Sequence, residues 1–519
     1  MTTRQTRRPQ SFRGIARRFP WTRLLLALTF AGAAPLGSLP AIAEDHGPGT
    51  YPYPARFPES AATQGAAGYP GLGIYQRAAE SGDDSCRDPD EWDLVVGDSE
   101  HAGAIAPPPE PVAANAMLTD QSASELTAGY DRGFFIQAAD ASEMPFRLQV
   151  NFQNQFRYTG FAAAEESWTD AAGDVLPIAD RNDFEIARGR LIFSGHAIDP
   201  DLNYYLNLDY GTLGDDRVTV LLGSVSYRLG EALELFCGKG KVPGSREWLL
   251  SSMYSHSPDR SLATTFFRPS ITTGIWARGE PTDTLLYHLL LGNGFNTAST
   301  GFRDLDTNFV YSGNLAWEPW GRFGPLYSDL EYRESAAVRL GGSLTSSRQS
   351  GTASDSQASE QTAIRLSDGT EISRLGALAP DVLVTDYSLL LANYDVGWKY
   401  RGVSISGEYY WRWLTDITGS GPIPEANRDF FDHGFYAQAG KFVIPGRVEL
   451  LGRTSQIFGE MGDGAEYALG FNCFPRQSEN WRIGFDVTQV NRSPAQQIRT
   501  GYDAGASGVM FRMQVQTMF

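Results

Sequence analysis

The chain of 519 residues carries 61 acidic against 43 basic residues, a formal net charge of −18, and contains 55 glycines and 12% aromatic residues. This acidity argues against a nucleic-acid binder, because phosphate contacts need a basic face, and so much glycine and aromatic content excludes a coiled coil or a helical array. Three cysteines without a CxxC spacing and six scattered histidines point to no disulfide framework, no metal site and no cofactor, and no apolar run is long enough for a transmembrane helix.

The first 43 residues have the layout of a cleaved secretory signal. Seven arginines and no acid occupy residues 1–23, an apolar run follows over residues 24–34, and residues 41–43 read Ala-Ile-Ala. A basic, then apolar, then small-residue order is typical of signal peptides. We therefore expect export, with cleavage after Ala43.

Residues 44–128 are predicted to be a disordered linker. Over residues 44–143 there are 18 acids against four arginines, with proline-rich stretches and no periodicity. Such a segment cannot bury enough apolar surface to offset the entropy of ordering. We assign it no function.

From residue 129 onward the sequence alternates between apolar and polar residues. The alternation is clearest over residues 146–158, 202–210, 403–413, 481–488 and 509–519. Several of these runs exceed the about 5–6 residues typical of soluble strands, and aromatics gather at their ends, as in strands that cross an outer membrane. Tight turns and long polar loops alternate between the runs.

We predict an all-β fold, a 16-stranded antiparallel transmembrane β-barrel over residues 129–519, with Phe519 beside the strand that starts near Phe146. Bulges are expected near residues 184 and 431, where the alternation slips. The predicted strands begin near residues 146, 184, 202, 218, 232, 271, 285, 309, 337, 387, 403, 431, 447, 465, 480 and 507.

A barrel of this size leaves an aqueous channel, and its inward positions carry mainly Arg, Asn, Gln, Asp and Ser. This pattern predicts an outer-membrane porin for passive diffusion of small hydrophilic solutes, surrounded by outer-membrane lipid. Rings of basic residues would select anions. The candidate pore-lining bases are Arg188, Arg190, Lys239, Lys241, Arg246, Arg260 and Arg268. Alternatively, these bases are paired with lumen acids such as Glu185, Glu234 and Glu247, which would leave a general porin.

Several motifs resemble the phosphate-selective porins O and P of Gram-negative outer membranes. They are GYDRGFFI at 129–136, FEIARGRLIFSG at 184–195, GKGKVPGSRE at 238–247, SPDRSL at 257–262, YRG at 400–402 and GEYY at 407–410. The resemblance implies a homotrimer and a third outer loop, about Val242–Ser270, folded inward as a constriction. It also implies anion or phosphate preference through bases there. The terminal Phe519 is similar to the signal that the barrel assembly machinery reads.

Other functions stay open. A structural or adhesive barrel without transport would have a plugged lumen. An outer-membrane or secreted hydrolase would need a nucleophile motif or a carboxylate pair, and the histidines of the barrel region lie in no such motif. We expect a channel and no enzymatic activity.

Overall fold

The computed structural model describes residues 126–140, 142, 145–212, 218–296, 308–350 and 363–519. The predicted signal peptide, and the predicted linker up to residue 125, lie outside the described residues. In the part of the chain that is described, no helix has the length and apolar character needed to cross a membrane.

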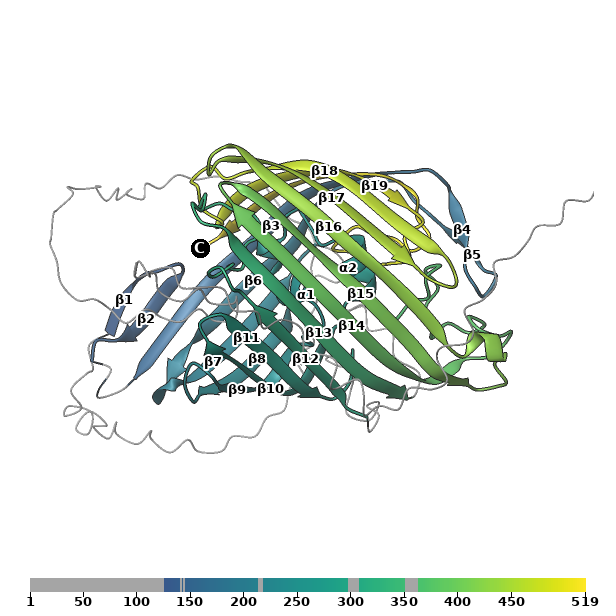
Figure 1. The fold of residues 1–519 in the computed structure, drawn as a ribbon, viewed down its shortest axis with the longest axis horizontal. Coiled ribbons are helices and arrows are strands. Elements are labelled where there is room, and N and C mark those ends of the chain that lie inside the picture. Colours follow the sequence, from purple (N-terminus) through teal and green to yellow (C-terminus); the bar gives the residue numbers. More distant parts are fainter. Residues whose placement is uncertain (1–125, 141, 143–144, 213–217, 297–307, 351–362) are drawn as a thin grey trace, which may run out of the picture. The chain divides into compact units, whose positions relative to one another are not determined.

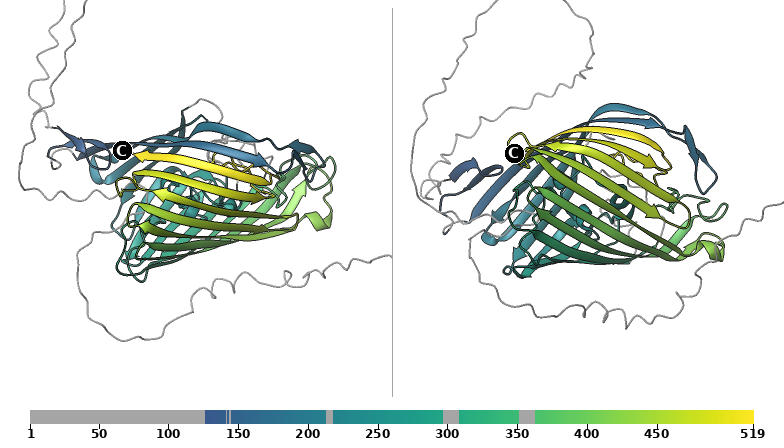
Figure 2. Two further views of the ribbon diagram at one scale, coloured as in Figure 1. Left: turned by 90° about the horizontal axis from the view of Figure 1, so that it is seen from above. Right: turned by 45° about the horizontal axis from the view of Figure 1, so that its top comes forward.

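Sixteen strands of the described residues form one closed antiparallel barrel (Figures 1 and 2). They are β3 (Phe146–Ala163), β6 (Arg181–Ala197), β7 (Asp199–Tyr210), β8 (Thr219–Arg228), β9 (Glu234–Lys241), β10 (Ile271–Thr282), β11 (Leu285–Gly292), β12 (Val310–Trp317), β13 (Ala337–Ser350), β14 (Val384–Tyr400), β15 (Val403–Gly419), β16 (Phe430–Ile444), β17 (Val448–Phe458), β18 (Asp463–Cys473), β19 (Trp481–Asn491) and β20 (Gly508–Met518). The predicted 16-stranded barrel is confirmed, and every strand starts within a few residues of its predicted position.

The last strand closes the barrel against the first. β20 pairs with β3 in the register Phe511↔Gly160, and beyond this ladder Phe519 and Phe152 exchange backbone hydrogen bonds of 2.6 and 3.0 Å. The predicted pairing of Phe519 with the first strand is therefore confirmed.

Two small hairpins accompany the barrel. β1 (Leu126–Tyr130) and β2 (Phe134–Ala138) pair with each other. β2 also pairs with the start of β3, on the same edge that β20 pairs with further along the strand. β1 thus begins within the range predicted as linker. β4 (Ser167–Thr169) and β5 (Val175–Pro177) form a separate two-stranded sheet in the connection after β3.

The two faces of the wall differ as a membrane barrel requires. Along β20, Phe511 and Met513 are 41% and 51% exposed, whereas Arg512 and Gln514 between them are almost fully buried. Successive side chains of a strand point to opposite faces. The apolar set therefore faces lipid and the polar set faces the lumen.

A bulge in β6 sets which residues reach the lumen. Gln155 pairs with Arg188 but Phe156 pairs with Ile186, so Ala187 is the extra residue. Residues three apart on a regular strand point to opposite faces, but the extra residue shifts the alternation by one. Glu185 and Arg188 therefore both point inward. The irregularity predicted near residue 184 is confirmed. The one predicted near 431 is wrong, because β15 and β16 pair there without a shift.

Connections are short at the barrel end that holds Phe519, for example residues 401–402 and 445–447, and mostly longer at the other end, where residues 459–462 form a short one. We assign the short-turn end to the periplasm, as in outer-membrane barrels. Residues 318–336, between β12 and β13, depart from the predicted pattern, because they form a long connection at this end. We call them the periplasmic strap.

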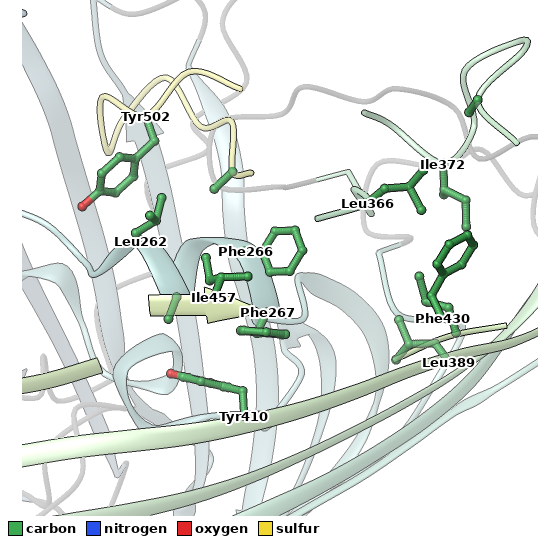
Figure 3. Packing of buried hydrophobic residues seen from close by; sticks show 14 of the residues in the cluster. Leu262, Phe266, Phe267, Leu366, Ile372, Leu389, Tyr410, Phe430, Ile457 and Tyr502 are labelled. Atoms are coloured by element: carbon green, nitrogen blue, oxygen red, sulfur yellow. The ribbon is translucent and has the colours of Figure 1, made fainter. Parts of the chain in front are cut away.

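The main apolar core lies inside the outer half of the barrel. Residues 242–270, which join β9 to β10, contain α1 (Arg246–Leu249), the 3-10 helix η2 (Ser252–Tyr254) and α2 (Leu262–Phe267), and η3 (Glu425–Asn427) lies in an outer loop. Phe266 and Phe267 of α2 belong to a buried cluster with Leu366, Ile372 and Tyr410 (Figure 3). The rings of Phe267 and Tyr410 stack 5.2 Å apart, so α2 is packed against the wall.

Candidate functional site

Residues 242–270 fold into the barrel and form the candidate site; we call them the constriction loop. All are buried except Ser251 and Tyr254, which are half-buried. Side-chain oxygens of Ser245 and Ser261 accept backbone amide hydrogen bonds and cap α1 and α2. The predicted inward fold of Val242–Ser270 is confirmed.

Carboxylates of the wall hold the starts of both short helices. Glu408 of β15 accepts hydrogen bonds from the backbone amides of Glu247 (2.6 Å) and Arg246 (3.2 Å). Glu466 of β18 accepts one from the amide of Leu262 at 2.8 Å. A carboxylate is favourable at these amides because the start of a helix presents unbonded N–H groups. The loop is thus fixed to the wall on several strands.

Asp259, in the constriction loop, is the centre of a buried ion-pair group. Arg188 of β6 binds both its oxygens, at 2.7 and 3.1 Å, and Arg157 of β3 binds it at 2.8 Å while also bonding Glu185 at 2.6 Å. Burial alone would raise the pKa of Asp259, but the charges of Arg188 and Arg157 outweigh burial and hold that pKa well below its usual range. Arg188 therefore anchors the loop through a charged carboxylate.

Arg190 is also paired. Its Nε lies 3.3 Å from Asp209 of β7, and the same carboxylate is bound at 2.7 Å by Arg499 from the outer connection before β20. One acid is shared by two arginines here, and Asp209 thus ties this outer connection to strands β6 and β7.

Lys239 is not brought to the site. Along β9 it shares a sheet face with the exposed Cys237, and its partner in β10, Thr273, is exposed as well. Its ammonium donates to the carbonyl of Val220 at 2.8 Å. The sheet register thus places Lys239 on the outer face.

Three of the predicted bases surround one indole. Lys241, Arg260 and Arg268 lie 4.7, 5.1 and 4.2 Å from the ring centre of Trp248. Lys241 also donates to the carbonyls of Trp248 and Leu250, at 2.8 and 3.0 Å. Cation–π contacts and carbonyl bonds are favourable for buried bases, and here they fasten the loop onto itself.

Arg246 has a different environment. Its guanidinium lies 4.6 and 4.4 Å from the ring centres of Phe323 and Tyr327, both in the periplasmic strap. Among the described residues no carboxylate forms an ion pair with it, and its Nη2 has no hydrogen-bond partner. Lys399 of β14 also approaches Phe323, with its ammonium 4.3 Å from the ring centre and donating to the carbonyl of Phe323 at 2.9 Å.

Six of the seven bases predicted to line the pore are buried inside the barrel, namely Arg188, Arg190, Lys241, Arg246, Arg260 and Arg268. The alternation also predicts that Glu408 points inward, but no helix-binding role was assigned to Glu408 or Glu466. The periplasmic strap, whose Phe323 and Tyr327 stand out as aromatics in a connection expected to be a turn, was not predicted either. The described residues contain no group of three or more His, Cys, Asp or Glu that could hold a metal ion.

Comparison with known proteins gives a family match. The family described as phosphate-selective porin O and P matches residues 167–519, while no curated protein matches the chain. Among solved structures, the anion-selective porin from Comamonas acidovorans is 13% identical, with a TM-score of 0.43 over 72% of this chain and 99% of its own. OmpF of Salmonella typhi, in complex with daunomycin, is 11% identical, with a TM-score of 0.45 over 76% and 100%. A loop L8 deletion mutant of OmpT from Vibrio cholerae is 12% identical, with a TM-score of 0.43 over 72% and 99%.

Proposed function

The chain belongs to the phosphate-selective porin O and P family, and from this premise we propose that it is a weakly selective diffusion porin rather than a phosphate-specific one. As a porin of the outer membrane, it is a channel and not an enzyme. Small hydrophilic solutes pass through the lumen, and the constriction loop sets its narrow part.

The observation that carries this proposal is the pairing of Arg157 and Arg188 with Asp259 and Glu185. Rings of arginine select anions only while their charge is not cancelled nearby. These two arginines and two carboxylates sum to zero charge, and the third arginine that binds Glu185 has a carboxylate partner of its own. The wall arginines therefore support the loop and contribute little selectivity.

The test is the reversal potential of the refolded protein in a planar bilayer under a KCl gradient, together with the Arg246→Ala/Arg260→Ala variant. We expect a small reversal potential in the parent, a small shift in the double variant and little block of chloride current by phosphate. A strongly anion-selective parent that loses its selectivity in the variant would contradict the proposal. Heat-modifiable migration on a gel confirms that each sample is a folded barrel.

A second candidate is a porin with anion preference. It is favoured by Arg246 and Lys399, which approach the same Phe323 ring and form no ion pair within the described part of the chain. If these two charges face the solute path, phosphate will block chloride current in the parent, and Lys399→Gln will relieve the block.

Three further expectations complete the proposal. The mature protein starts after Ala43, the barrel assembles as a homotrimer, and Phe519 engages the barrel assembly machinery. Mass spectrometry of the mature N-terminus and cross-linking of the folded protein in membranes check the first two. Deleting Phe519 should lower the amount of folded protein in the outer membrane.

A further inference from the structure

The periplasmic strap enters the lumen from the end opposite to the constriction loop. It joins β12 to β13 at the short-turn end, yet Phe323, Tyr327, Ser328 and Asp329 are at most 2% exposed. A turn that merely connected two strands would leave its side chains in water. The middle of the strap, residues 323–329, is therefore packed inside the barrel, while residues toward both of its ends are exposed.

The strap forms hydrogen bonds with strands that are far from the two strands it joins. The hydroxyl of Tyr327 lies 3.1 Å from that of Tyr436 in β16, and Ser328 Oγ donates to Glu449 of β17 at 2.7 Å. Both partners are buried lumen-facing residues. The strap thus spans part of the lumen.

The strap meets the constriction loop at two points. Phe323 and Tyr327 enclose the guanidinium of Arg246. Glu449, which accepts from Ser328, also lies 3.0 Å from Nε2 of His256 in the constriction loop. Two connections that enter from opposite membrane faces are therefore joined inside the barrel.

We propose that the periplasmic strap is the second half of the constriction: it narrows the lumen from the periplasmic side and fixes the constriction loop through Arg246. This inference rests on the proposed passage of solutes through the lumen. Phe323 and Tyr327 then determine pore size, because their rings occupy lumen volume and hold Arg246 in place.

The test compares unitary conductance of the full-length parent, the Phe323→Ala/Tyr327→Ala variant and a matched control, Phe474→Ala. Phe474 is another buried aromatic in a periplasmic connection, but its ring contact is with Phe442 of β16. We expect higher conductance in the double variant than in the parent, with larger current fluctuations as the constriction loop loosens, and parent-like conductance in the control.

Parent-like conductance in a double variant that still shows heat-modifiable migration would overturn the inference. So would an equal rise in the control, because any lost aromatic would then suffice. If the double variant fails to fold, Tyr327→Ala alone decides by the same comparison. A parent without conductance would contradict the proposed function itself, and the inference with it.

Discussion

Two groups of lumen cations, alike in sequence, are held in different ways. Arg157 and Arg188 bind the carboxylate of Asp259, whereas Arg246 lies between two aromatic rings without an ion pair among the described residues. The first arrangement fixes the loop and cancels charge, and the second leaves charge in place. The role of a lumen base is therefore set by its nearest carboxylate and not by its place in a row of bases.

The largest expected effect is on stability, from Asp259→Ala. Two buried arginines would lose their shared partner, and breaking a buried ion pair costs about 3–5 kcal/mol. The free energy of unfolding in urea, followed by heat-modifiable migration, should fall by this amount. Glu165→Ala, at an exposed site, should change it by less than about 0.5 kcal/mol. Equal effects would show that the Asp259 group is not a principal anchor.

A smaller loss is expected from Tyr327→Phe. The hydroxyl contact with Tyr436 disappears, while Tyr436 keeps its bond to Glu408 at 2.9 Å, so the loss should be about 0.5–1.5 kcal/mol. The ring over Arg246 remains, so unitary conductance should stay at the parent value. A conductance change as large as that of Phe323→Ala/Tyr327→Ala would mean that the hydroxyl, and not the ring, sets the pore.

Mild acid should have little effect through Asp259. Folding lowers the pKa of Asp259 from 3.8. The charged carboxylate therefore makes its full contribution to the free energy of unfolding above the unfolded pKa, and that contribution is lost only as pH falls toward the lower folded pKa. Conductance should therefore show no step assignable to Asp259 between about pH 7 and about pH 5. A step in the parent that is absent in Asp259→Asn would contradict this assignment.

The smallest effect is expected from Lys239→Ala. The register places Lys239 on the outer face, where it bonds one carbonyl. Its charge should not reach the solute path, and reversal potentials should match the parent. A shift toward cations would place this lysine in the lumen.

The fold was largely predictable because strands such as β20 alternate strictly between lipid-facing and lumen-facing residues. Apolar Phe511 and Met513 alternate with Arg512 and Gln514 as lipid and lumen require. The exception is β6, where the extra residue Ala187 changes the register. A sequence pattern shows only that alternation slips there, and the pairing of Arg188 depends on the neighbouring strand.

The site was only half predictable. Arg188 was identified as a lumen base, but its partner Asp259 lies 71 residues away in a loop, and spacing cannot show which of many acids will meet it. The periplasmic strap is harder still to predict, because its inward path depends on Tyr436 and Glu449, which lie on distant strands. Such long-range contacts leave no local pattern.

The most direct measurement of charge cancellation is the reversal potential of Asp259→Asn beside that of the parent, in one salt gradient. The amide keeps the shape of the carboxylate but removes the charge that Arg157 and Arg188 share. We expect a small reversal potential in the parent and a clear shift toward anion selectivity in the folded variant. A parent that is already strongly anion-selective, with no shift in Asp259→Asn, would contradict this expectation.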